Sequence, residues 1–132
     1  MGKVKISIER PLRSRSESII WKLISTPSGL SRWIAEQVTQ EGNSLVFTWG
    51  KPGQVYETRW ARILDVEKNA AIRFLWEDED DPEAYTEIAM VKLDVTDEIA
   101  LCITDFSDPD DIESMTYMWN HDLDRLQNKM GI

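Results

Sequence analysis

The sequence contains one cysteine, one histidine and no long apolar run, and each scarcity excludes a class of protein. Cys102 alone cannot form an internal disulfide or a cysteine-based zinc site, and His121 alone cannot supply a multi-histidine metal site. No apolar stretch approaches the roughly 18–20 residues of a membrane span, and no secretion signal follows the start. We therefore expect a cytoplasmic protein with no membrane span, no metal site and no cofactor.

Basic residues are also few, because 15 Lys and Arg stand against 24 Asp and Glu, a formal net charge of −9. Binding to a phosphate backbone needs clustered Lys and Arg, so this acidic composition argues against a nucleic-acid partner. A chain of 132 residues, 42% of them apolar, can bury a core without a disulfide or a metal. No linker, repeat or low-complexity tract divides it, so we expect a single domain over residues 1–132.

Alternating and capping patterns predict the order of the elements. Residues 3–10 alternate apolar and polar side chains, which is typical of a half-buried strand. Ser14 and Glu17 have the spacing of a capping box, and Thr26-Pro27 is typical of an N-cap followed by proline at the first helical position. Two short helices are therefore expected after the first strand. Further strands are expected at about residues 37–40, 45–49, 54–66, 70–77, 84–95 and 98–106.

The last helix has the clearest pattern. Asp108 and Pro109 predict its start, and Gly131 predicts its end. Its apolar residues recur at helical spacing, at Ile112, Met115, Trp119, Leu123, Leu126 and Met130. A long helix laid across the concave face of a curved antiparallel sheet buries both apolar surfaces. We expect an α+β fold with about six to seven strands, two short helices after the first strand, and this helix across the concave face.

Residues 26–33, TPSGLSRW, resemble the T-P-x-x-L-x-x-W stretch of START-like (SRPBCC) proteins. Residues 103–106, 118–119 and 123–131 resemble a small bacterial START-like subgroup of unknown function. The resemblance covers essentially the whole chain and implies the helix-grip fold, which is also that of the C-terminal domain of a heat-shock chaperone's ATPase activator. It implies a pocket between the sheet and the last helix. Members bind lipids, polyketides, hormones or other bulky apolar compounds, some are cyclases or hydrolases, and some bind proteins. The superfamily shares no catalytic set, so we assign no catalytic residue.

Tryptophan is abundant, with six in 132 residues. Large aromatic side chains form cores and pocket walls alike, and methionine adapts to irregular ligands as readily as to irregular cores. Each of these side chains has ordinary core packing as its alternative. We expect the pocket to be lined by Trp33, Trp49, Trp60, Phe74, Trp76, Met90, Met115 and Trp119.

Two acidic clusters have structural explanations. Residues 77–83 lack the glycine of an EF-hand calcium loop and fall between two predicted strands, which favours a solvated hairpin loop. The second cluster lies at the start of the last helix, where anions are favourable, and is explained by helix capping. It comprises Asp105, Asp108, Asp110 and Asp111.

Few residues are candidates for proton transfer. His121 falls on the helix face turned away from the core, and Cys102 lies in a strongly apolar strand where a buried thiol is inert. Glu57 and Glu87 either point into a cavity, where burial would raise their pKa values, or lie on the solvent face of the sheet. The alternation of side chains along these strands does not decide between the two positions.

Three functions fit these observations. A carrier or sensor of a bulky apolar or aromatic molecule predicts an apolar pocket without converging polar groups. A cyclase- or hydrolase-type enzyme predicts a buried carboxylate or arginine beside the pocket. A protein-interaction module, either a chaperone co-factor or a homodimer, predicts a filled core and an exposed apolar patch. We favour the first function, which is binding of a hydrophobic small molecule rather than catalysis.

Overall fold

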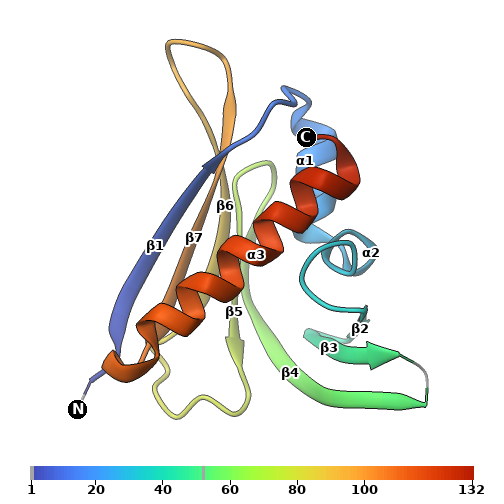
Figure 1. Ribbon diagram of the computed structural model, residues 1–132, viewed down its shortest axis with the longest axis vertical. Helices are drawn as coiled ribbons and strands as arrows, with labels where there is room; N and C mark the ends of the chain where they lie inside the picture. The colour runs from blue at the N-terminus through green and yellow to red at the C-terminus, as the bar shows by residue number, and fades with distance from the viewer. Residues whose placement is uncertain (1, 52) are drawn as a thin grey trace.

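The computed structural model describes residues 2–51 and 53–132, apart from the side chain of Val55, and its elements follow the predicted order (Figure 1). They are β1 (Val4–Pro11), α1 (Glu17–Ser25), α2 (Pro27–Leu30), β2 (Gln37–Glu41), β3 (Ser44–Lys51), β4 (Gln54–Glu67), β5 (Ala71–Trp76), β6 (Thr86–Lys92), β7 (Ile99–Ser107), a 3₁₀ turn (Pro109–Asp111) and α3 (Ile112–Met130). The predicted α+β architecture, with two short helices after the first strand, is confirmed.

The seven strands form one antiparallel sheet in the order β1-β7-β6-β5-β4-β3-β2. Strands β2 to β7 pair with their neighbours along the chain, while β1 pairs with β7 at the opposite edge. The register shifts between Trp49 and Gly50 in β3 and between Ile63 and Asp65 in β4, and such bulges increase strand twist and bending. The sheet curves around α3, which crosses its concave side diagonally (Figure 1).

Capping fixes the two short helices. The N-cap of α1 is Ser16, whose hydroxyl accepts the N–H three residues further on at 3.4 Å, so the expected cap at Ser14 is wrong by two residues. Ser14 instead accepts the Ser16 N–H at 3.2 Å and turns the chain before the helix. Thr26 caps α2 as predicted, accepting the Gly29 N–H at 3.0 Å. A Cβ on Gly29 would collide with the backbone of Lys22, so glycine permits the close approach of α2 to α1.

The long helix begins three residues later than its sequence signal. The chain after Asp108 first makes the 3₁₀ turn, and the Asp108 side chain makes no capping hydrogen bond. Gly131 ends α3 in the left-handed conformation with φ 67°, as predicted. Arg10 of β1 holds the helix against the sheet edge, because its guanidinium donates to Asp124 at 2.7 Å and to Gln127 at 3.0 Å.

The hydrophobic core lies between the sheet, α1, α2 and the C-terminal half of α3. Trp33 is fully buried there, and its Nε1 donates to the Leu23 carbonyl at 2.9 Å. Leu123 and Leu126 bring α3 into the same core. The N-terminal half of α3 packs less closely, and this difference between the two halves of the helix positions the candidate site.

Candidate ligand-binding site

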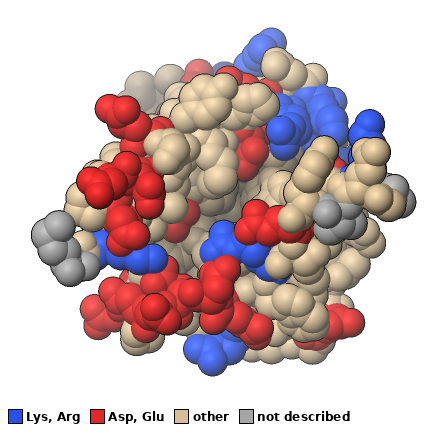
Figure 2. Space-filling view, turned by 60° about the horizontal axis from the view of Figure 1, so that its bottom comes forward, with Lys and Arg blue, Asp and Glu red and all other residues tan. Residues whose placement is uncertain are grey.

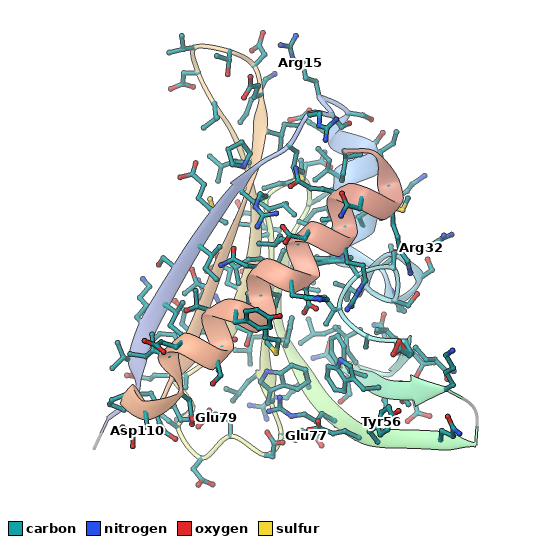
Figure 3. The ribbon with its side chains drawn as sticks, viewed as in Figure 1. Arg15, Arg32, Tyr56, Glu77, Glu79 and Asp110 are labelled. Carbon is teal, nitrogen blue, oxygen red and sulfur yellow. The ribbon has the colours of Figure 1, made fainter. Side chains whose placement is uncertain are left out.

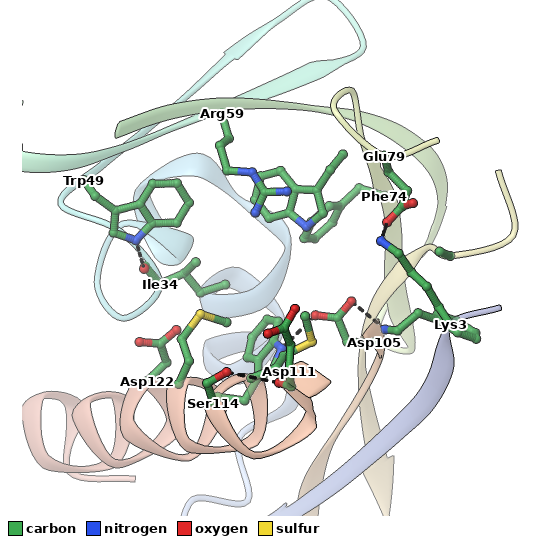
Figure 4. Close-up of a pocket in the computed structure, with 16 residues that line it drawn as sticks. Lys3, Ile34, Trp49, Arg59, Phe74, Glu79, Asp105, Asp111, Ser114 and Asp122 are labelled. Carbon is green, nitrogen blue, oxygen red and sulfur yellow. Dashed lines mark hydrogen bonds and ion pairs between the residues drawn. The ribbon is translucent and has the colours of Figure 1, made fainter. Parts of the chain in front are cut away.

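A cleft of about 340 Å³ separates the N-terminal half of α3 from the concave face of the sheet (Figure 4). It continues into a more open groove, and Ile34, Trp49, Arg59, Met118 and Asp122 line both parts. Figure 2 shows a hollow near the middle of this face, with Asp and Glu gathered along its left and lower borders. The volume lies within the roughly 300–1,000 Å³ that small-molecule sites occupy.

One wall of the cleft is aromatic and rigid. Trp49 of β3 and Trp76 of β5 lie on the concave face with their ring centroids 6.3 Å apart, and Phe74 meets Trp76 edge-on at 5.4 Å. Phe47 stacks behind Trp49 at 6.0 Å. The Trp49 indole N–H donates to the carbonyl of Ile34 at 2.9 Å, which fixes its ring orientation. These rings are therefore ordered before any ligand arrives.

Arg59 of β4 joins this wall to the loop between β5 and β6. Its Cζ lies 4.0 Å from the centroid of the Trp76 ring, a cation–π contact. The same guanidinium donates to both carboxylate oxygens of Asp78, Nε to Oδ2 at 2.9 Å and Nη2 to Oδ1 at 2.7 Å. These hydrogen bonds, more than the charge of Arg59, lower the pKa of Asp78.

The acidic loop at residues 77–83 joins the antiparallel strands β5 and β6 and is largely exposed, as expected of a solvated hairpin loop. Besides the Asp78 pair, Glu79 forms an ion pair with Lys3, the residue before β1, and the Glu79 side chain is only 10% exposed. Figure 3 shows Glu77 and Glu79 on this loop at the lower end of the sheet, with Glu79 on the side nearer Asp110 at the start of α3. Two of its carboxylates, Asp78 and Glu79, also attach the loop to the border of the cleft.

Asp105 does not cap the last helix, and here the structure corrects the sequence-based expectation. It lies on β7, which continues to Ser107, and its side chain faces inward and is 6% exposed. Trp119 Nε1 donates to Oδ2 at 2.9 Å, Thr86 Oγ1 donates to Oδ1 at 3.1 Å, and the Phe106 N–H donates to Oδ1 at 2.9 Å. Burial raises the pKa of Asp105, and these hydrogen bonds oppose the rise. The carboxylate thereby ties α3 to β6 and β7.

Asp122 of α3 is the second buried carboxylate at the cleft, and it has far fewer partners. It is 8% exposed, and its one hydrogen bond within the described part of the chain is a long one, 3.5 Å from Arg125 Nη1 to Oδ1. The same Arg125 nitrogen donates to the Trp33 carbonyl at 2.9 Å. Burial raises the pKa of Asp122 to about 7, and the charge of Arg125 only partly opposes this.

The eight side chains expected in the pocket divide into three groups. Five of them border the cleft, namely Trp49, Phe74, Trp76, Met115 and Trp119. Trp33 and Met90 are buried in the core and do not border it. Trp60 lies on the convex side of β4, since its neighbours Arg59 and Ala61 face the concave side, and it is 40% exposed.

The structure shows which face of the sheet each of the two strand glutamates occupies. Glu57 faces the open groove with 59% of its side chain exposed, while Glu87 lies on the convex side and pairs with Arg73 at 3.0 Å. Neither is a buried cavity acid. His121 is exposed as expected, beside Tyr117 at the rim of the groove. Cys102 is half-buried on the convex side rather than buried in the core.

Sequence reasoning misses Asp122 and Met118 and misassigns Asp105. Asp122 follows Trp119 by three residues and Met118 by four, so helical spacing places it at the edge of the apolar stripe. Asp105 continues the inward alternation of Leu101 and Ile103. Both signals are present in the sequence, but an acidic residue within an apolar pattern is easily interpreted as an interruption.

In the described residues no helix is both long and apolar enough to cross a membrane.

Comparison with known proteins agrees with this architecture. The family model of the START-like superfamily domain matches residues 1–132. The solution structure of a Bacteroides fragilis protein is 35% identical, with a TM-score of 0.65 over 100% of this chain and 94% of that chain. No match was found among curated proteins.

Two more distant structures share the fold alone. The Aha1 dimer from Colwellia psychrerythraea is 17% identical, with a TM-score of 0.68 over 95% of this chain and 94% of that one. DynU16, from the dynemicin biosynthetic locus, is 13% identical, with a TM-score of 0.75 over 96% of this chain and 47% of that one. With the family model matched from end to end, the chain belongs to the START-like superfamily.

Proposed function

We propose that this chain is a binding or carrier domain for a bulky apolar or aromatic small molecule, held between the concave face of the sheet and α3. The observation that carries the proposal is the ordered aromatic wall of Trp49, Phe74 and Trp76 beside a cleft of about 340 Å³. The START-like fold often binds hydrophobic ligands, which is consistent with this use of the cleft.

The two sides of the cleft suit an aromatic ligand for different reasons. The Trp49 ring is fixed by its hydrogen bond to Ile34, so little side-chain entropy remains to be lost when a ligand stacks on it. Met115 and Met118 on α3 are flexible and polarizable, and they can adapt to the outline of the ligand. Met118 is 45% exposed without a ligand, so a bound molecule would also cover apolar surface now in water.

An enzyme of the cyclase or hydrolase type is the second candidate, because buried carboxylates and an arginine do border the cleft. Of these groups, Arg59 is engaged by Asp78, and Asp105 accepts three hydrogen bonds. Asp122 retains the most free accepting capacity, and a pKa of about 7 would suit an acid–base group. One such carboxylate supports binding of a polar group on the ligand more directly than it supports a reaction.

A protein-interaction role, as a homodimer or with a chaperone, is the third. Four large apolar side chains on β4 and β6 are 40–51% exposed, namely Trp60, Leu64, Val66 and Val91. Light scattering after gel filtration tests the homodimer directly. A concentration-independent monomer would remove that form of the alternative.

Native mass spectrometry of the purified protein, followed by denaturing extraction, tests the binding proposal even when the ligand is unidentified. A stoichiometric apolar adduct supports it. In parallel, the fluorescence of the neutral dye Nile red should rise on binding. Trp76→Ala should lower the affinity for the dye by about tenfold, because it removes part of the aromatic wall. Trp60→Ala is the matched control, since Trp60 lies on the convex side. Equal effects of both variants, or no dye binding together with a clean apo mass, would contradict the proposal.

A further inference from the structure

The described residues that line the cleft and its groove carry more acidic than basic groups. Three bases are present, and each is already engaged: Lys3 by Glu79, Arg59 by Asp78, and Arg125 by the Trp33 carbonyl. The carboxylates are Glu36, Glu57, Glu79, Asp105, Asp111 and Asp122. An anionic ligand would therefore meet an unfavourable field.

Among these carboxylates, Asp122 is distinguished by being buried with a single, distant partner, Arg125. A carboxylate has about four accepting sites, and Asp122 uses one of them, at 3.5 Å. No side-chain oxygen of the described residues is both fully buried and without a partner, so the unused accepting sites of Asp122 open toward the cleft. Arg125 does not approach more closely because its guanidinium is directed to the Trp33 carbonyl at 2.9 Å. The site thus lacks a donor, and a positively charged donor would satisfy it best.

The position of Asp122 places that donor inside the proposed site. Asp122 borders both the enclosed cleft and the open groove, as do Trp49 and Met118. Figure 4 shows its carboxylate rising from α3 toward Ile34 and Trp49. A cation held there would lie near an indole ring, and the contact between Arg59 and Trp76 at 4.0 Å shows that this wall already accommodates a cation on a ring face.

We propose that the ligand of this cleft is an apolar amine, whose ammonium group donates to the Asp122 carboxylate while its apolar body lies against Trp49 and Met118. This inference rests on the proposed binding function and specifies the chemical class of the ligand. A neutral ligand would leave the Asp122 charge with only its long Arg125 contact, whereas an ammonium both neutralises the charge and supplies up to three donors.

Three probes that share one ring system test the charge of the ligand. Naphthylmethylamine is cationic, naphthylmethanol is neutral and naphthylacetate is anionic. Binding is followed by tryptophan fluorescence and calorimetry at about pH 8, where Asp122 is ionised. The other charged groups facing Asp122 are Arg125 on its own helix, Arg59 and Glu57 from β4, and Glu36 from the segment before β2, with His121 at the rim. We expect the amine to bind about tenfold or more tightly than the alcohol, and the acetate to bind most weakly.

Asp122→Asn then assigns the preference to one side chain. It keeps the shape of the residue and removes its charge, and the protein should still fold because the burial penalty of that charge is removed. Amine affinity should fall by about 10- to 100-fold, while alcohol affinity changes by less than about twofold. Glu113→Gln is the matched control, since it removes one negative charge from the exposed first turn of the same helix and should leave both affinities unchanged.

The outcomes separate this inference from the function on which it rests. Alcohol binding as tight as amine binding, or an amine preference that persists in Asp122→Asn, would overturn the assignment of an amine and leave the apolar site intact. Failure of all three probes to bind at about 1 mM, combined with no Nile red binding, would overturn both.

Discussion

Asp105 and Asp122 are both buried carboxylates bordering one cleft, and they differ in the number of hydrogen bonds that they accept. Asp105 is 6% exposed and accepts hydrogen bonds from an indole N–H, a hydroxyl and a backbone N–H. Asp122 is 8% exposed and accepts one long hydrogen bond. Burial raises the pKa of both, but only for Asp105 does a set of hydrogen bonds oppose the effect.

This difference separates a structural carboxylate from one available to a ligand. A buried charge with its partners in place fixes the geometry around it, as Asp105 does for α3, β6 and β7. A buried charge with few partners destabilises the unliganded protein, and such groups are concentrated at functional sites. In this cleft the first group holds the helix over the sheet, and the second lies where a ligand would contact it. Three substitutions test that division.

The largest effect is expected from Trp119→Ala. Trp119 is 3% exposed, and its removal leaves a cavity between α3 and the sheet and takes away the indole donor of Asp105. We expect a loss of about 3–5 kcal/mol in the free energy of unfolding, measured by urea titration. Trp119→Phe, which keeps most of the ring but lacks the N–H, should lose about 1–2 kcal/mol. If Trp119→Ala lost less than the Phe variant, the helix would not depend on this contact.

Asp122→Asn should stabilise the unliganded protein, and increasingly so as the pH rises. The pKa of Asp122 is raised from 3.8 to about 7 in the folded state, so the native protein binds an additional proton between these values. The stability that this residue contributes is therefore complete below about pH 4 and is lost as the pH approaches 7. The shift of about three pKa units already includes the opposing charge of Arg125 and corresponds to about 4 kcal/mol, so we expect a gain of about 2–4 kcal/mol above pH 7.

Urea titrations of the wild type and Asp122→Asn at about pH 4.5 and pH 8 check this prediction. The two proteins should have similar stability at the lower pH and diverge at the higher one. A variant less stable than the wild type at pH 8 would show that Asp122 has a stabilising partner, which would weaken its assignment to the ligand.

The fold was largely predictable because its signals are local. The alternation in β1, the Thr26-Pro27 cap and the apolar stripe of α3 each depend on a few neighbouring residues, and each predicted element is present. The prediction of an N-cap at Ser14 was wrong because Ser14 and Ser16 both precede the helix closely enough to cap it, and the structure uses Ser16. The 3₁₀ turn before α3 was not predicted for a similar reason. Asp108-Pro109 indicates where a helical segment starts, but not whether its first turn is 3₁₀ or α-helical.

The site was less predictable because it depends on strand pairing. Residues 54–66 have apolar and polar side chains at both odd and even positions, so the sequence did not show which of them face the concave side of the sheet. The pairing of Trp60 with Val46 in the structure places Trp60 on the convex side. Trp33 and Trp49 are the same residue type, but Trp33 is fully buried in the core and Trp49 borders the cleft. Asp105 and Asp122 look alike for the same reason, because no local pattern records how many donors a folded chain brings to a carboxylate.

Asp105→Asn should have the smallest effect, and its sign is opposite to that of Asp122→Asn. The indole N–H of Trp119 donates to one oxygen of Asp105 and the backbone N–H of Phe106 donates to the other. An asparagine presents one oxygen and one NH₂ group, so whichever way it turns, one of these donors faces another donor. An unpaired buried donor costs about 1–3 kcal/mol, partly offset by removal of the buried charge, and we expect a net loss of about 1–2 kcal/mol at neutral pH.

Urea titration of both Asn variants side by side measures the contrast. Stabilisation by both substitutions would show that the hydrogen bonds of Asp105 do not compensate its burial, and the distinction between a structural and a ligand-facing carboxylate would then rest on position in the cleft alone.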